Sequence, residues 1–308
     1  MNSTKNSIGT QSKFSKFMNK DNTVGYVFAT PFIIGFLGFT IIPMIVSLYF
    51  SFTNYNLTSA PLWIGIQNYV RMFKADGRFI KSVAVTLYYV FVSIPLKLSF
   101  ALLIAILLTK RSKAVSVYRS VYYLPSLIGG SVAVSLVWKS LFSTKGVINS
   151  IIAGFGATRI SWFGSQTFAI WPLILMTVWQ FGSSMIIFAA GLKQIPTSYY
   201  EAARIDGAGA FKQFLYITIP TLSPVILFNL VMQMISGFMS FTQAFIITNG
   251  GPNDSTNFYA LYVYNQAFKY FDMGYASAMA WVLLIIIAAI TGVIFKTSSA
   301  WVFYESKD

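Results

Sequence analysis

The segment LKQIPTSYYEAARIDGAGAFKQFLYITIP, residues 192–220, is long and well patterned for a connector between apolar runs. Pro196 lies near its start. Ser198, followed three residues later by Glu201, has the spacing of a capping box, in which two side chains satisfy the free N–H groups of a helix start. The segment therefore predicts a short helix over residues 199–205.

Two glycines follow this helix. Gly207 and Gly209 are expected to end it, because glycine accepts the backbone angles with which helices terminate. A second helix is expected from about Ala210 to Pro220. The segment is thus predicted to form two short helices that meet at a glycine corner and lie on the cytoplasmic face of a membrane.

The rest of the chain requires a membrane as its solvent. Of its 308 residues, 56% are hydrophobic and 10% are charged, whereas soluble domains carry about 25% charged residues. The net charge of +14 does not indicate nucleic acid, because the cations stand between long uncharged runs. The chain has no Cys and no His. This excludes disulfides, thiol and imidazole catalysis and the usual zinc ligands, so neither a catalytic nor a metal site is expected.

Six apolar runs are long enough to cross a bilayer, which takes about 20 residues of helix. In lipid each span must satisfy its own backbone hydrogen bonds, so we predict an all-α membrane protein with six transmembrane helices. None of the runs contains Asp or Glu, and only Lys97 and Lys139 are cations well inside them. The predicted spans are residues 24–50, 83–108, 120–142, 166–191, 221–248 and 275–296.

An even number of spans places both termini on one side. The segments on that side hold 13 Lys and Arg residues, against 8 on the other side, and the richer side is expected in the cytoplasm. The densest group of basic residues on this side is Lys110, Arg111, Lys113 and Arg119. We therefore expect one six-span domain over residues 24–296, with the connector at 192–220 and with residues 1–23 and 297–308 as cytoplasmic ends.

Polar side chains line up inside two spans. Those of the fifth span recur at steps of 4, 3, 4 and 3 and would share one face of a helix. Such a face is expected either to line a wet pathway or to make hydrogen bonds between helices. The candidate pathway residues of the fifth span are Asn229, Gln233, Ser236, Ser240 and Gln243, and those of the fourth span are Thr177, Trp179, Gln180 and Ser184.

Other features of the spans leave alternatives open. The mid-span cation Lys97 is expected to reach the membrane surface, to bind carbonyls freed by Pro95, or to contact a solute. Prolines within the spans indicate either ordinary kinks or hinges. They are Pro31, Pro43, Pro95, Pro125, Pro172 and Pro224.

Several segments resemble carbohydrate ABC importer permeases. Glu201-Ala202-Ala203, Gly207, Ile217 and Ile219-Pro220 have the spacing of their EAA motif and depart from it only at 219, where Ile replaces Leu. Residues 118–125 and 137–138 look like the third-span region of these permeases. Residues 248–279 are similar to the extracytoplasmic loop of the first permease in maltose-type and glycerol-phosphate-type systems.

This resemblance implies an ABC importer type I permease fold in a bacterial cytoplasmic membrane. It implies half of a pathway for a sugar or oligosaccharide, completed by a second homologous permease, two ATP-binding subunits and an extracytoplasmic solute-binding protein. The chain itself would bind no cofactor, because ATP would be used by the partner subunit. The resemblance also implies that the connector couples the permease to the ATPase, through Glu201, Ala202, Ala203, Asp206, Gly207 and Gly209. Glu201 could instead serve only the capping box, and Gly207 only the helix end.

Other function classes fit less well. A secondary, ion-coupled transporter remains the alternative, although proton coupling usually needs an acid or His inside the membrane and the predicted spans have neither. The eight acids show no close catalytic pair, and the chain has no GxxxxGK[ST] phosphate-binding loop. A channel would need a filter or a ring of pore charges, which the sequence does not show.

Overall fold

The computed structural model describes residues 21–108 and 113–303, which are mostly helical. Two short antiparallel strands, β1 (Thr53–Asn54) and β2 (Leu62–Trp63), form the sheet of these ranges. Residues 1–20, 304–308 and the predicted cluster members Lys110 and Arg111 lie outside the described residues.

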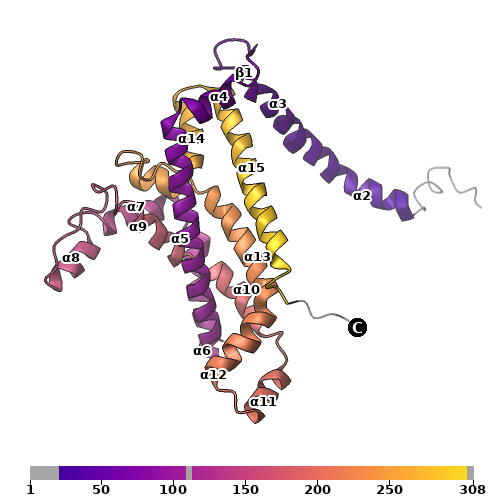
Figure 1. Cartoon of the computed structure of the whole chain (residues 1–308), viewed down its shortest axis with the longest axis vertical. Helices are drawn as coiled ribbons and strands as arrows, with labels where there is room; N and C mark the ends of the chain where they lie inside the picture. Colours follow the sequence, from indigo (N-terminus) through magenta and orange to yellow (C-terminus); the bar gives the residue numbers. More distant parts are fainter. Residues whose placement is uncertain (1–20, 109–112, 304–308) are drawn as a thin grey trace, which may run out of the picture.

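The helices follow one another along the chain, with longer connections at residues 52–66 and 155–170 (Figure 1). The first half of the chain forms α2 (Asp21–Phe36), the π-helical turn η1 (Leu37–Ile41), α3 (Ile42–Ser51), α4 (Gln67–Lys74), α5 (Gly77–Leu107), α6 (Lys113–Ile128), α7 (Val132–Leu141) and α8 (Val147–Gly154). The second half forms α9 (Trp171–Trp179), α10 (Gly182–Leu192), α11 (Thr197–Ile205), α12 (Ala210–Gln213), the π-helical turn η2 (Phe214–Thr218), α13 (Ile219–Phe238), the π-helical turn η3 (Ala244–Thr248), α14 (Tyr259–Tyr264), the π-helical turn η4 (Asn265–Lys269) and α15 (Met273–Ser298).

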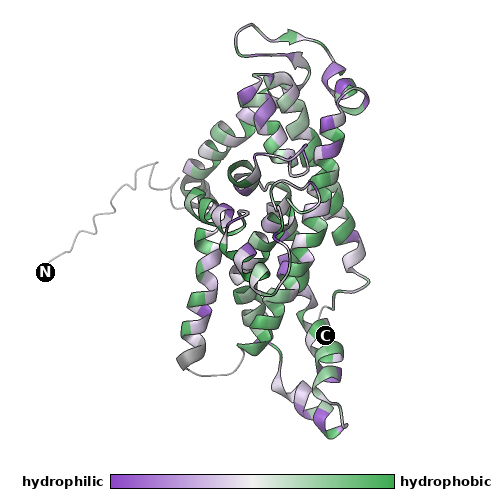
Figure 2. Cartoon of the chain, turned by 90° about the vertical axis from the view of Figure 1, so that its left-hand side faces the viewer, coloured by the Kyte–Doolittle hydropathy of each residue, from purple (hydrophilic) through white to green (hydrophobic). Residues whose placement is uncertain are grey.

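Four continuous helical stretches are long and apolar enough to cross a membrane: residues 28–51, 77–107, 210–238 and 273–298. Two bent pairs bring the number of candidate spans among the described residues to six. The pair α6 and α7 is bent by 100°, and the pair α9 and α10 by 42°. The hydropathy colouring agrees with this assignment, since apolar residues predominate along the long helices (Figure 2). An all-α fold is therefore confirmed, with four candidate spans, or six if each bent pair crosses the membrane once.

The two sharp breaks do not fall at the prolines. Pro125 lies inside α6 and Pro172 in the first turn of α9, whereas the chain bends after Ile128 and around Gln180. The hydroxyl of Ser126 closes the second break: it donates to the Gln180 carbonyl at 3.0 Å and accepts from the Ser183 N–H at 3.0 Å. The backbone groups left open by this bend are thus satisfied inside the protein, as lipid requires.

Close packing of α10 against α6 depends on one glycine. A Cβ atom at Gly182 would collide with the backbone carbonyl of Tyr122. Such a contact cannot be relieved by moving a flexible side chain, because the obstacle is backbone. Gly182 therefore lets α10 approach α6 closely enough for the hydroxyl of Ser126 to bridge the break.

Helix α5 lies at the centre of the bundle and contacts α9, α10 and α13. Its buried side chains Val90 and Ile94 belong to one apolar core with Leu173 of α9 and Phe188 of α10. Lipid is as apolar as these side chains, so the core holds the helices together by van der Waals packing and not by transfer from water.

The first span stands away from this bundle (Figure 1). Helix α3 packs against α15, but the apolar side chains of the preceding turns are bare: Phe28 is 80% exposed, Phe32 75% and Phe39 88%. Lipid or another protein must cover these side chains, because water does not stabilise them.

A polar cluster joins the elements at the α4 end of the molecule. The Asp76 carboxylate accepts hydrogen bonds from the hydroxyls of Tyr262 (2.7 Å) and Tyr275 (2.6 Å) and from the Phe79 N–H (3.0 Å). Partial burial acts to raise the pKa of Asp76, but these hydrogen bonds outweigh it and hold the pKa below its usual value. The cluster ties the start of α5 to α14 and α15.

Replacing Asp76 by Asn should lower the free energy of unfolding by about 1–2 kcal/mol, because charge-assisted hydrogen bonds become neutral ones. A carboxyl whose pKa is lowered by folding stabilises the protein above its unfolded pKa of about 3.9, and this contribution is lost as the pH falls through the folded value. Thermal unfolding of the detergent-solubilised protein should therefore separate Asp76→Asn from the wild type at pH 7, and less so as the pH falls below about 4. An equal difference at every pH would contradict this assignment.

Candidate functional site

The connector at 192–220 forms the two predicted helices at the end of the molecule opposite α4 (Figure 1). Helix α11 covers the predicted 199–205 and starts two residues earlier. The predicted capping box is wrong: α11 starts after Pro196, with no side-chain hydrogen bond to cap it, so Ser198 lies inside the helix. The second helix starts at Ala210 as expected, but continues without interruption through η2 into α13, past Pro220.

Gly207 ends α11 in the left-handed conformation predicted for a corner glycine, with φ +76°. The N–H of Gly207 donates to the Arg204 carbonyl at 3.1 Å, and the N–H of Ala208 to the Ala203 carbonyl at 2.8 Å. This pair of hydrogen bonds is the Schellman motif. A Cβ atom at Gly207 would meet no other atom of this chain, so the requirement for glycine comes from its φ angle.

The connector has an exposed surface, and hydrogen bonds link its two helices. Glu201, Asp206 and Gly209 are exposed, and three large apolar side chains beside them are strongly exposed: Ile205 by 87%, Phe211 by 74% and Tyr216 by 73%. The hydroxyls of Tyr200 and Thr218 lie 2.9 Å apart, and the Gln213 side chain donates to the Ala208 carbonyl at 2.8 Å. These contacts hold the two helices together, so the corner can move as a unit.

The sequence predicted that the polar residues of the fifth span share one helix, but they do not all lie on one helix. Helix α13 ends at Phe238, and the N–H of Ser240 turns back to the Gly237 carbonyl at 3.1 Å. Asn229, Gln233 and Ser236 therefore lie on α13, whereas Ser240 lies in the break after α13 and Gln243 in the helical residues that lead into η3. Hydrophobic spacing gave no sign of this break, because apolar residues continue across it.

Tyr89 of α5 nevertheless brings the two predicted spans together. Its buried hydroxyl lies 2.5 Å from the Thr177 hydroxyl and 3.5 Å from that of Ser240, and Thr177 also donates to the Gln243 side-chain oxygen at 3.4 Å. Thr177, Ser240 and Gln243 thus meet at one point of the bundle. Sequence reasoning missed Tyr89, which nothing distinguishes among 18 tyrosines.

The remaining candidate residues occupy separate environments. The Trp179 ring lies 5.4 Å from that of Trp138, and the Gln180 amide donates to the Met176 carbonyl at 3.2 Å, at the break between α9 and α10. Ser184 and Asn229 are fully buried, and their side chains have no hydrogen-bond partner among the described residues. Ser236 is exposed and donates to the carbonyl of Met232.

Lys97 is the buried cation of the described spans, with 8% of its surface exposed. Its ammonium donates to the Gln233 side-chain oxygen at 2.7 Å. The expected contacts with carbonyls near Pro95 are not among the hydrogen bonds of Lys97 in the described residues. The structure thus joins the mid-span charge to a predicted pathway residue, a pairing that the sequence did not predict.

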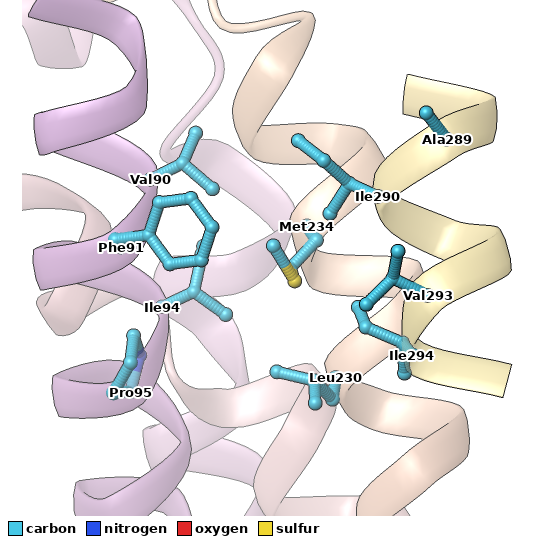
Figure 3. A pocket seen from close by; sticks show the side chains of 10 residues that line it. All are labelled: Val90, Phe91, Ile94, Pro95, Leu230, Met234, Ala289, Ile290, Val293 and Ile294. Carbon is cyan, nitrogen blue, oxygen red and sulfur yellow. The ribbon is translucent and has the colours of Figure 1, made fainter. Parts of the chain in front are cut away.

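An apolar groove of about 390 Å³ runs between α5, α13 and α15 (Figure 3). Its walls include Phe91 and Pro95 of α5, Leu230 and Met234 of α13, and Ile290 of α15. A sugar needs hydrogen-bonding partners that these side chains do not offer, so the groove is not a candidate solute site. Within residues 21–108 and 113–303, no three acidic side chains gather in a group that could hold a metal ion.

Residues 72–302 match the family described as binding-protein-dependent transport system inner membrane component. A probable ABC transporter permease protein of Bacillus subtilis, YesP, is 54% identical over 96% of this chain and 97% of its own. The multiple sugar-binding transport system permease protein MsmF of Streptococcus mutans is 34% identical over 83% of this chain and 88% of its own. A probable starch degradation products transport system permease protein, AmyD of Thermoanaerobacterium thermosulfurigenes, is 30% identical over 91% of this chain and 94% of its own.

The fold is also that of a solved transporter. A chain of a bacterial ABC transporter involved in the import of the acidic polysaccharide alginate superposes with a TM-score of 0.78, at 21% identity, over 93% of this chain and 98% of its own. At that identity the likeness concerns the fold, and it confirms the arrangement of an ABC importer permease.

Cysteine labelling tests whether the polar face of α13 is wet. The chain has no native Cys, so single cysteines can be placed at 236, which is exposed, and at 229, which is fully buried. Ser236→Cys should react with a water-soluble thiol reagent at least ten times faster than Asn229→Cys. Val225→Cys, at the partly buried base of α13, gives a further reference. If Ser236→Cys were as unreactive as Asn229→Cys in every transport state, this face would pack against lipid or protein.

Proposed function

The chain belongs to the family of binding-protein-dependent transport system inner membrane components, and on this premise we propose that it forms half of the pathway by which an ABC importer moves a sugar or oligosaccharide. The observation that carries this proposal is the kinship with MsmF and AmyD, whose names refer to multiple sugars and to starch degradation products. The relatives are transport permeases, so a role as an enzyme is not proposed.

The polar side chains of the bundle support a pathway for a hydroxyl-rich solute. Tyr89, Thr177, Ser240 and Gln243 form one group of hydroxyls and an amide inside an otherwise apolar bundle, and Gln233 and Ser236 continue the polar face along α13. A sugar replaces its water shell by such groups. We propose that Thr177, Gln180, Gln233, Ser236, Ser240 and Gln243 contribute to the pathway, that Trp179 supports it through its packing, and that the unpaired side chains of Ser184 and Asn229 become satisfied in another transport state.

The connector supports coupling to a separate ATPase. The chain has no phosphate-binding loop of its own, so ATP would be bound and hydrolysed by partner subunits and not by this chain. An exposed apolar surface rimmed by Glu201 and Asp206 is the kind of surface that marks a protein interface. We propose that Glu201, Ala202, Ala203, Asp206, Gly207 and Gly209 dock on the ATPase, and that the continuous helix from Ala210 to Phe238 transmits its movement to the pathway.

The exposed first span supports pairing with a second permease. The apolar side chains of Phe28, Phe32 and Phe39 have no cover within the described chain, and half a pathway needs a second half. Two ATP-binding subunits and an extracytoplasmic solute-binding protein would complete the importer. We propose that both termini and the connector lie in the cytoplasm, because the basic residues of the sequence favour that side.

The ion-coupled secondary transporter considered from the sequence gains no support from these relatives. A secondary transporter would also leave the exposed surface of the connector without a binding partner. The coupling assignment and the solute assignment are separate, and each has its own test.

The chain should purify from native membranes with one homologous permease and two copies of an ATPase. The reason is that the connector offers a docking surface while the sequence has no GxxxxGK[ST] phosphate-binding loop. Native mass measurement of the detergent-extracted complex, with peptide identification of its subunits, checks this composition. A transport-active complex that contains only copies of this chain would contradict the proposal.

Replacing Gly207 by Val should reduce ATP hydrolysis stimulated by the loaded binding protein at least fivefold, or abolish ATPase attachment. A β-branched residue is strained at φ +76°, so the corner would change shape. Gly65 is a matched control: its φ is +59° and it has open space around it, but it lies near the strands at the other end of the molecule. Gly65→Val should keep attachment and stimulated hydrolysis. If Gly207→Val kept both and lost only solute affinity, the connector would not be the coupling element.

A further inference from the structure

We infer that Lys97 is the site at which this importer recognises the negative charge of its solute, and that the solute class is an acidic oligosaccharide whose carboxylate pairs with the Lys97 ammonium. This inference rests on the proposed function and deepens it. The starting point is that Lys97 is 8% exposed and that its recorded side-chain partner is the neutral amide of Gln233, at 2.7 Å.

A buried ammonium normally needs an opposite charge. Moving a charge out of water is costly unless the charge is paired and hydrogen-bonded, and one amide oxygen satisfies only one of the three donors of the ammonium. The two ion pairs of the described chain, Arg71–Asp272 and Arg78–Asp254, use acids at the α4 end. The described membrane spans contain no acid between Gly77 and Leu107 or between Ala210 and Phe238 that could neutralise Lys97. Any anion that pairs with Lys97 therefore comes from outside these two helices.

The position of Lys97 points to the solute rather than to lipid. Lys97 is ten residues from the end of α5, or about 15 Å along the helix, and its ammonium is held inside the bundle by Gln233 of α13. Lys97 follows Pro95 by two residues, a turn of about 200°, and Val90 by seven residues, which is nearly two full turns. It therefore lies beside the face of α5 that lines the apolar groove (Figure 3). Neither Lys97 nor Gln233 lines that groove.

Unsatisfied polar groups flank the Lys97–Gln233 pair. Ser93 lies one turn before Lys97 on α5, and Asn229 lies one turn before Gln233 on α13. Both side chains are fully buried, and their polar atoms have no hydrogen-bond partner among the described residues. Buried polar groups without partners are rare and costly. A hydroxylated, charged solute would supply partners for this layer, whereas an apolar or purely cationic one would not.

The experiment uses the complete importer reconstituted in proteoliposomes with its binding protein. The probes are a set of alginate oligosaccharides, carboxyl-reduced forms of the same oligosaccharides, which are neutral, and acidic and neutral oligosaccharide digests of plant polysaccharides. Uptake of each member is measured by mass spectrometry. We expect wild-type uptake to favour acidic members, and Lys97→Met to lower the ratio of acidic to neutral uptake at least tenfold while Lys97→Arg restores most of it.

Two further variants separate this role from a structural one. Gln233→Glu places a carboxylate beside Lys97, and this carboxylate pairs with the ammonium in place of the solute. The variant should therefore also lower the ratio of acidic to neutral uptake. Lys139→Met removes another span-borne cation, whose ammonium donates to the Ile246 carbonyl at 3.2 Å, and should leave the ratio unchanged. The amount of assembled complex, measured by gel filtration, checks folding of each variant.

The outcomes distinguish the two levels of the proposal. Uptake of neutral oligosaccharides alone would keep the proposed function and overturn the inference about Lys97. Acidic uptake with an unchanged ratio in Lys97→Met and Gln233→Glu, or an equal shift in Lys139→Met, would overturn it as well. ATP-dependent uptake of no oligosaccharide from either set would overturn the proposed sugar-import function and, with it, the inference.

Discussion

The hydroxyl of Ser126 satisfies two backbone groups at once where α9 breaks from α10, and the shape of the bundle depends on this kind of closure. A bilayer offers no water to a broken helix, so a bend persists only where the protein supplies the missing partners. Gly182 makes the closure possible by letting α10 approach the backbone of α6. With that bend in place, Thr177 at the end of α9 lies beside Tyr89 of α5.

The centre of the bundle is therefore both packed and polar. Val90 and Ile94 of α5 pack against α9, α10 and α13 in an apolar core, while Tyr89 and Lys97 on the same helix contact polar side chains of α9 and α13. A transporter needs this combination, because the apolar contacts hold the helices together and the polar ones offer partners to a solute. The groups left without partners, Ser184 and Asn229 among them, show where this state of the bundle is incomplete.

The corner of the connector is under different constraints, because α11 and Gly207 lie outside the candidate spans. Its helix ends by a Schellman motif at Gly207, and its exposed face is apolar. A surface of this kind gains stability from a protein partner rather than from water. Because the second connector helix is continuous with α13, a displacement at the connector reaches Asn229, Gln233 and Ser236 without passing through a flexible loop.

The sequence by itself determined the number of candidate spans, the two-helix connector and its corner glycine, because apolar length and glycine spacing are local properties. It also predicted most of the polar side chains that the bundle gathers. It did not predict the breaks after Ile128 and Phe238, the absence of the capping box at Ser198, or the contacts of Tyr89 and Lys97. Only the tertiary structure decided these. The bend at Gln180 and the buried charge of Lys97 are stabilised by side chains of other helices, Ser126 and Gln233, and such partners have no fixed spacing along the chain.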